Sequence, residues 1–216
     1  MGTSLWIVPN EQDAERLKTL MRRTRQNERA DFPSSYPAFH PHVTLASFPS
    51  ASTSTSAPST AAIRAALDSA LHGADNPLPN PRPRPIQIAF ESLELGTHFF
   101  RSVYIAAAPT PALRALHGAV HAGLGVAPRT PAFPHLSLCY VGDADAEERG
   151  RFWGEVRVRV RGGCEHGGGD GEGGRVSIWC GEEGGWVAGF EAGEVWVVEC
   201  DGPVEGWTVL DKISIV

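Results

Sequence analysis

The sequence has few cysteines, and none of them stands in a metal-binding or redox motif. There are 4 in 216 residues, with no C-x-x-C pair and no zinc-ligand spacing among them. This absence argues against a zinc module or a dithiol redox site, and it predicts free thiols in a reducing compartment. Bridges from Cys180 to Cys164 or to Cys200 stay open as alternatives, and Cys139 is the fourth cysteine.

The chain also lacks a long apolar run and a secretory leader. No stretch of about 18 apolar residues occurs, and the sequence does not open on a charged segment followed by an apolar one. We therefore expect an intracellular, cytoplasmic protein that has no membrane segment and is a monomer.

Positive charge is in short supply. Against 25 Asp and Glu there are 19 Lys and Arg, which gives a formal net charge of −6, and only Lys18 and Lys212 are lysines. Binding to long nucleic acid depends on neutralising many phosphates, so this balance argues against such a partner. A small anionic nucleotide in a locally positive pocket remains compatible with it. The length is sufficient for one domain with a real core.

What the sequence does contain is one short motif in two copies. Pro41-His42-Val43-Thr44-Leu45 and Pro134-His135-Leu136-Ser137-Leu138 share the order Pro, His, apolar, hydroxyl, Leu, and their histidines are 93 residues apart (135 minus 42). None of the other six histidines has a hydroxyl residue two positions later. Two unrelated histidines would not share the flanking residues, so the duplication predicts a paired functional site.

Both copies of the motif are typical of strands. Val, Thr and Leu favour or tolerate extended backbone, and each Pro stands where a strand can begin. Side chains i and i+2 of a strand point to the same face. His42 and Thr44 therefore share one face, as do His135 and Ser137, and each pair is backed by an apolar face that can enter a core. Two such imidazole–hydroxyl pairs can face each other across a cleft.

These residue types fit acid–base chemistry on a phosphate ester. Histidine titrates near neutrality, so one imidazole can take a proton from water while the other gives one to the leaving oxygen. The hydroxyls of Thr44 and Ser137 can donate to the phosphoryl oxygens. This set requires no metal and no cofactor, and a zinc site on His40 and His42 lacks further ligands at a matching spacing. The motifs do not decide which histidine is the acid.

The two motifs resemble the paired signature of the 2H phosphoesterase superfamily. The similarity to its plant and fungal cyclic phosphodiesterase branch covers about residues 4–215, apart from low-complexity insertions. Three segments carry this similarity: Ser4-Leu5-Trp6-Ile7-Val8-Pro9, Phe100-Arg101-Ser102-Val103-Tyr104 and His135-Leu136-Ser137-Leu138-Cys139-Tyr140. The resemblance implies a bilobal fold, with two antiparallel sheets related by a pseudo-two-fold axis, outer helices and a central cleft. It also implies that His42 and His135 act as general acid and base.

The same resemblance implies the substrates. They are 2′,3′-cyclic nucleotides, opened to 2′-phosphates, and ADP-ribose 1″,2″-cyclic phosphate, a by-product of tRNA splicing. Two other functions stay open. An enzyme of the same fold could act on RNA ends, as a 2′-5′ RNA ligase-like protein or an exonuclease, but the negative charge and the lack of a basic stripe argue against it. A nucleotide-binding module without turnover is disfavoured by the intact histidines and hydroxyls.

Patterns along the remaining chain predict an α+β fold. Besides the motif strands, strands are expected at Ser4–Val8, Ile86–Leu95, Arg101–Ala107 (a hairpin that turns near Gly96 and Thr97), Val156–Arg161, Arg175–Cys180, Glu194–Cys200 and Trp207–Ile215. Helices are expected at Glu11–Arg29, Ala61–Leu71, Pro111–Gly123 and from a cap at Asp143 or Asp145 to Trp153. Composition predicts flexible insertions near 47–60, 76–85 and 162–174 within a single bilobal domain, 1–216.

Two more residues are candidates for substrate binding. Strict alternation places Cys139 in the cleft and Tyr140 behind it, whereas the family pattern places this tyrosine near the substrate, which requires a twist or a strand end at Cys139. Trp6 either lies beside the cleft, where it could stack on a base, or belongs to the core. The other candidates are expected away from the chemistry: Tyr104 and Phe100 in the core and His40 in a loop.

Overall fold

The computed structural model describes residues 2–22, 35–49, 57–72, 85–128, 130, 132–162 and 175–215. The helices in these ranges are α1 (Glu11–Met21), α2 (Thr60–His72), α3 (Pro111–Gly123), α4 (Ala146–Arg157) and one 3-10 turn, η2 (Val204–Gly206). The strands are β1 (Gly2–Val8), β2 (Val43–Pro49), β3 (Ile86–His98), β4 (Arg101–Ala107), β5 (His135–Cys139), β6 (Val160–Gly162), β7 (Val176–Trp179), β8 (Trp186–Val187), β9 (Gly189–Ala192), β10 (Glu194–Glu199) and β11 (Thr208–Ser214).

The two motif strands occupy the middle of one large sheet. The strand order is β11-β10-β1-β2-β5-β4-β3-β9, and all its pairings are antiparallel. Its two four-stranded halves meet at β2 and β5, through a single registered pair between Val43 and Leu136. These are the central residues of the two motifs. The predicted α+β fold is confirmed, and its two sheets are halves joined at one point. Strands β6, β7 and β8 form a separate small sheet.

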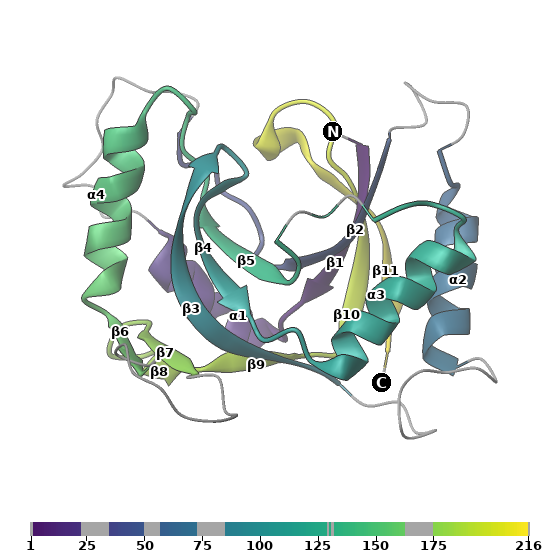
Figure 1. Cartoon of the computed structure of the whole chain (residues 1–216), viewed down its shortest axis with the longest axis horizontal. Helices are drawn as coiled ribbons and strands as arrows, with labels where there is room; N and C mark the ends of the chain where they lie inside the picture. Colours follow the sequence, from purple (N-terminus) through teal and green to yellow (C-terminus); the bar gives the residue numbers. More distant parts are fainter. Residues whose placement is uncertain are drawn as a thin grey trace.

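The helices pack across the two halves (Figure 1). Helices α2 and α3 contact each other and lie against β11 and β2, whereas α1 and α4 lie against β5, β4 and β3. Helix α1 follows β1 in the chain but contacts β5, and α3 follows β4 but contacts β2. Each half of the sheet is therefore covered by a helix whose preceding strand belongs to the other half. This exchange ties the two halves together although few sheet contacts join them.

The apolar face of each motif strand enters the core, as the parity argument predicts. Val43, Leu45, Leu136 and Leu138 are all essentially inaccessible to solvent. Burying each such side chain contributes about 1.5–3 kcal/mol. The helices present matching apolar stripes at helical spacing: Ala14, Leu17 and Leu20 on α1, and Leu113, Leu116 and Val120 on α3. The apolar faces of the motif strands are thereby fixed by packing in the core, and their polar side chains lie on the opposite face.

Helix starts follow local sequence signals. Asn10 caps α1 by accepting a hydrogen bond from the Asp13 amide, and Thr110 caps α3 just before its first-turn proline. Of the two predicted caps for α4, Asp145 is the one used, since its carboxylate accepts from the Glu148 amide.

The predicted strand over residues 156–161 is wrong in its first half. Helix α4 continues to Arg157, and only Val160–Gly162 forms a strand. The alternation of Val with Arg suggested a strand, but Phe152 and Val156 lie four residues apart and are both buried beneath the helix. Tertiary packing of this pair therefore overrides the local strand preference.

The β3–β4 hairpin also turns later than predicted. Strand β3 runs on to His98, and the turn is at Phe99 and Phe100. Gly96 is needed for close strand approach, because a Cβ there would lie 1.7 Å from the Arg101 carbonyl oxygen. The short strands β8 and β9 carry too little pattern to have been predicted.

Most of the three predicted insertions lie outside the described residues, as does the part of the predicted first helix beyond Arg22. Where their edges are described, regular structure extends into them. Residues 47–49 complete β2 and pair with β1, and Thr60 begins α2. The prediction of a loop from Ser47 is therefore wrong, because the neighbouring strand supplies hydrogen bonds that composition cannot reveal.

Candidate active site

Each motif strand carries a bulge one residue after its hydroxyl residue. Between β1 and β2 the register passes from Trp6 opposite Thr44 to Leu5 opposite Ala46, which leaves Leu45 extra. Between β4 and β5 it passes from Tyr104 opposite Ser137 to Val103 opposite Cys139, which leaves Leu138 extra in the same way. A bulge shifts the alternation of side chains beyond it by one residue. The pseudo-symmetry of the motifs therefore extends to the backbone and to an aromatic residue opposite each hydroxyl.

The shifted alternation brings one more residue of each strand to the polar face. A cavity of about 320 Å³ is lined by His42, just before β2, by Thr44 and Ser47 from β2, and by His135, Ser137 and Tyr140 at β5. Ser47 and Tyr140 are themselves 93 residues apart (140 minus 47), like the two histidines. The structure thus brings the four predicted motif residues together in one cavity, and it adds Ser47, which the sequence analysis missed.

The two imidazoles are oriented in the same way. His42 Nδ1 lies 2.7 Å from the backbone oxygen of His40, and His135 Nδ1 lies 3.0 Å from that of Ala132. A carbonyl oxygen can only accept, so each Nδ1 carries the hydrogen and donates it. In the neutral form each Nε2 is then the unprotonated nitrogen, ready to accept a proton. In the charged form the same atom is the one that gives it.

His42 is the more enclosed of the pair. Its ring stacks on Trp6, with centroids 3.7 Å apart and planes 8° apart, and only 6% of the residue is exposed. Burial lowers the pKa of His42 to about 3, although the hydrogen bond to His40 opposes this. The indole face would favour an imidazolium by about 0.5–2 kcal/mol. A pKa lowered from 6.5 to about 3 corresponds to about 5 kcal/mol, so His42 stays neutral at pH 7.

His135 is held less tightly. Its aromatic neighbour Tyr104 meets it edge-on, with centroids 5.2 Å apart and planes 68° apart, and part of the ring remains accessible. Burial lowers the pKa of His135 as well, the carbonyl of Ala132 raises it, and the charge of Arg101 lowers it further. The two imidazoles therefore differ in environment, although their motifs are alike.

Hydroxyl groups stand beside both imidazoles. Ser137 Oγ donates to the Phe100 carbonyl at 2.9 Å. On the other side, Ser47 Oγ and Ser4 Oγ are 3.1 Å apart. Burial raises the pKa of Tyr140 above its usual value, so its phenol stays protonated and can donate. The cavity thus has hydroxyl groups from both motif strands in its lining, together with the two imidazoles.

The bulge at Leu138 decides between the two positions considered for Tyr140. Tyr140 lines the cavity of the two histidines, and its ring stacks on Phe39 with centroids 4.1 Å apart. Cys139 lies on the other side of the strand, against a second cavity. The expectation from strict alternation is therefore wrong.

Other aromatic predictions change in part. Trp6 borders the cavity, but only 3% of it is exposed and one face of its indole is taken by His42, so it supports the imidazole instead of presenting a free stacking face. Phe100 is wrongly predicted as core, because it is 38% exposed and lines the cavity. It stacks on Trp207, with centroids 6.0 Å apart and planes 28° apart. Trp207 was not among the sequence candidates, since nothing in its local pattern sets it apart.

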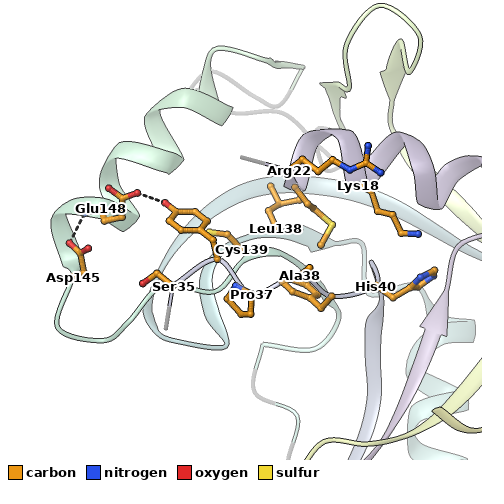
Figure 2. A pocket seen from close by; sticks show the side chains of 13 residues that line it. Lys18, Arg22, Ser35, Pro37, Ala38, His40, Leu138, Cys139, Asp145 and Glu148 are labelled. Atoms are coloured by element: carbon orange, nitrogen blue, oxygen red, sulfur yellow. Dashed lines mark hydrogen bonds between the residues drawn. The ribbon is translucent and has the colours of Figure 1, made fainter. Parts of the chain in front are cut away.

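A second and larger cavity, about 780 Å³, lies between α1, residues 35–40, the end of β5 and α4 (Figure 2). Lys18 and Arg22 border it, and both pair with Glu15. His40 also borders it, and burial followed by the charges of Lys18 and Lys212 lowers its pKa to about 4. Of the described residues that line this cavity, His40 is the one histidine, whereas the smaller cavity holds both motif histidines and is therefore the candidate active site.

The described cysteines form no disulfide. Cys139, Cys180 and Cys200 are free and buried, so neither alternative bridge from Cys180 exists, and Cys164 lies outside the described residues. In the described ranges no three His, Cys, Asp or Glu side chains are grouped closely enough to hold a metal ion. No helix in the same ranges is both long and apolar enough to cross a membrane.

The doubled sheet and the paired imidazole–hydroxyl strands define the chain as a 2H phosphoesterase. Over residues 1–215 it matches the family described as "Cyclic phosphodiesterase-like protein", and it belongs to that family. No curated protein matches it in sequence. Two solved structures share the fold: E. coli LigT complexed with 3′-AMP and a protein described as a phosphoesterase. Each is 13% identical with a TM-score of 0.51, and each alignment covers 100% of this chain and 98% of the other.

Proposed function

We propose that the chain hydrolyses small cyclic phosphodiesters without a metal ion. The substrates are 2′,3′-cyclic nucleotides, which yield 2′-phosphates, and ADP-ribose 1″,2″-cyclic phosphate, which yields ADP-ribose 1″-phosphate. The observation that carries the proposal is the pair of Nε2 atoms at His42 and His135, each left free by a carbonyl bond at Nδ1 and each beside a hydroxyl, in one cavity. Two positioned imidazoles supply both proton transfers that the reaction needs.

The two histidines have different roles in this proposal. His42 is the base, because burial keeps its stacked ring neutral at working pH, so the lone pair of its Nε2 is available to take a proton from the attacking water. His135 is the acid, because its ring is more accessible to solvent and an imidazolium there is less costly. Water oxygen attacks phosphorus, the bond from phosphorus to the ribose 3′ oxygen breaks, and His135 protonates that oxygen. Thr44 and Tyr140 donate to the phosphoryl oxygens as charge gathers on them, and Ser137 joins them when its hydroxyl turns from the Phe100 carbonyl to the substrate.

Size and charge support a small substrate. A cavity of about 320 Å³ is at the lower end of the range for small-molecule sites. The net charge of −6 disfavours long nucleic acid. The nucleotide bound to LigT, a protein of the same fold, supports a nucleotide-like ligand here. Together with the similarities in sequence, these points favour the plant and fungal branch and a role in disposing of tRNA-splicing by-products.

The direct test is turnover of 2′,3′-cyclic AMP with identification of the product. We expect adenosine 2′-phosphate as the sole product, resolved from the 3′ isomer by chromatography, and a rate that EDTA does not diminish. A 3′-phosphate product would contradict the proposed bond cleavage. Action on oligonucleotide ends but not on cyclic mononucleotides would point to RNA-end processing instead. Binding without turnover of either cyclic substrate would leave a nucleotide-binding module.

The proposed roles also set the pH dependence of kcat/KM. The acid limb reports protonation of the base His42, whose pKa is about 3, and the alkaline limb reports deprotonation of the acid His135, whose pKa is lowered from 6.5. Activity should therefore be bell-shaped, with its maximum below pH 6.5 and a fall of about tenfold per pH unit beyond the upper limb. Initial rates between pH 4.5 and 8.5 check the alkaline limb, since the acid limb near pH 3 lies below this range. A kcat/KM that rises from pH 6.5 to 8.5 contradicts the assignment.

A further inference from the structure

Arg101 is the one permanently charged side chain among the described residues that line the active-site cavity. No Asp or Glu is found in that part of the lining. Arg101 is half-buried, and no salt bridge or side-chain hydrogen bond joins it to another described residue. A guanidinium is always protonated and carries five donors. A partly desolvated cation that has no carboxylate partner in the cavity lining can bind an anionic group of the ligand.

Arg101 is separated along β4 from the residue opposite His135, although its side chain lines the same cavity. It is the first residue of β4, whereas the β4 residue opposite His135 is Ala106. Five residues of strand separate them, which is about 16 Å of backbone. Arg101 instead pairs with His98 at the end of the β3–β4 hairpin and follows the exposed Phe100.

Its electrostatic influence is also one-sided. Besides burial and the Ala132 carbonyl, the charge of Arg101 acts on the pKa of His135. The pKa of His42 is changed by burial and by the neighbouring groups His40 and His135. The guanidinium therefore acts on the His135 side of the cavity, the side on which the proposed mechanism places the leaving oxygen.

The distribution of negative charge on the ligand indicates which of its phosphate groups Arg101 binds. A cyclic phosphodiester carries one negative charge, which the hydroxyl groups that line the cavity can meet with neutral donors. A further phosphate or diphosphate on the same nucleoside adds charge away from the cyclic phosphate. An arginine fork matches phosphate oxygens in two parallel hydrogen bonds, which is the geometry such a group requires.

We propose that Arg101 binds a phosphate group outside the cyclic phosphate, and that it makes the enzyme select cyclic phosphates that carry one. This specificity role rests on the proposed function, because it assumes that a nucleoside phosphate occupies the cavity. It predicts a higher affinity and kcat/KM for substrates with a 5′-phosphate or an internal diphosphate than for nucleoside 2′,3′-cyclic phosphates that lack one.

The test compares two ligands that differ in one phosphate, by calorimetric titration of the intact protein. Adenosine 2′-phosphate lacks the outer group and adenosine 2′,5′-bisphosphate has it. We expect the wild-type protein to bind the bisphosphate about 10–100-fold more tightly, the range of a charge-assisted hydrogen-bonded contact. Arg101→Gln should remove this difference and leave the affinity for adenosine 2′-phosphate nearly unchanged. Arg101→Lys should retain part of it, because it keeps the charge and loses the fork.

Arg114→Gln is the matched control, since Arg114 is exposed on α3 outside the cavity lining, and it should bind both ligands as the wild type does. Equal weakening of both ligands by Arg101→Gln would place Arg101 on the shared 2′-phosphate and overturn the proposal. An equal affinity of the wild type for the two ligands would overturn it as well. The titration needs no turnover, so it separates this role from the proposed reaction. Where cyclic substrates are hydrolysed, Arg101→Gln should lower kcat/KM about 10–100-fold more for the 5′-phosphorylated substrate than for the other one, because its effect on the pKa of His135 is common to both.

Discussion

Replacing either His42 or His135 by alanine is expected to lower kcat for 2′,3′-cyclic AMP by about 10²–10⁴-fold. Each imidazole makes one of the two proton transfers, and a positioned acid or base contributes a factor of that size. The hydroxyls and Tyr140 remain in both variants, so residual activity above the uncatalysed rate should persist. Initial rates at saturating substrate measure the effect, and KM should change much less because neither Nε2 is the main binding group.

The double variant sharpens this test. Two groups that act in one concerted step do not contribute additively, so the variant lacking both histidines should be about as slow as the slower single variant. His72→Ala is the matched control, because His72 is an exposed histidine at the end of α2, outside the cavity lining. Thermal unfolding of all variants should be compared, since His42 packs on Trp6. A folded His42 or His135 variant with full activity would rule out the mechanism.

The parts of the site that the sequence predicts are those within one strand. Alternation correctly pairs His42 with Thr44 and His135 with Ser137, because both members of each pair precede the bulge. Beyond the bulge the same rule fails, and Cys139 and Tyr140 exchange sides. A bulge is a mismatch between the residue counts of two strands, so it cannot be read from one of them.

The bulges also explain why Ser47 was missed. Its segment is rich in Ser, Thr and Ala and looks like a loop, yet Ser47 pairs with Ser4 and faces the cavity. One signal was present in the sequence: Ser47 and Tyr140 keep the 93-residue offset of the two motifs. In a duplicated site, further paired residues can thus be found by comparing positions that are separated by the same offset as the two motifs.

Aromatic residues were the least predictable part. Trp6 and Tyr104 lie on strands and Phe100 lies in a turn, and the local sequence patterns do not reveal which neighbour each ring meets. Trp6 is opposite Thr44 and stacks on the imidazole, whereas Tyr104 is opposite Ser137 and meets the other imidazole edge-on. These contacts arise only when separate strands pair. They distinguish two histidines that their motifs leave equivalent.

That difference leads to the second large effect, which concerns the leaving group. In a substrate with sulfur in place of the ribose 3′ oxygen, the phosphorus–sulfur bond breaks and a thiolate leaves. A thiol has a pKa near 8.5, so its thiolate needs no proton from an acid. The loss of kcat in His135→Ala should therefore shrink from about 10²–10⁴-fold on the oxygen substrate to about tenfold or less on the sulfur substrate.

His42→Ala should lose about 10²–10⁴-fold on both substrates, because the attacking water must be deprotonated whichever group leaves. Release of the free thiol, followed with a chromogenic disulfide, measures the sulfur reaction directly, and His72→Ala again serves as the control. Rescue of His42→Ala instead of His135→Ala would reverse the two roles. Equal losses for both variants on both substrates would mean that neither histidine protonates the leaving group. The paired motifs alone cannot separate these outcomes, whereas the stacked, buried ring of His42 and the more open ring of His135 predict only the first.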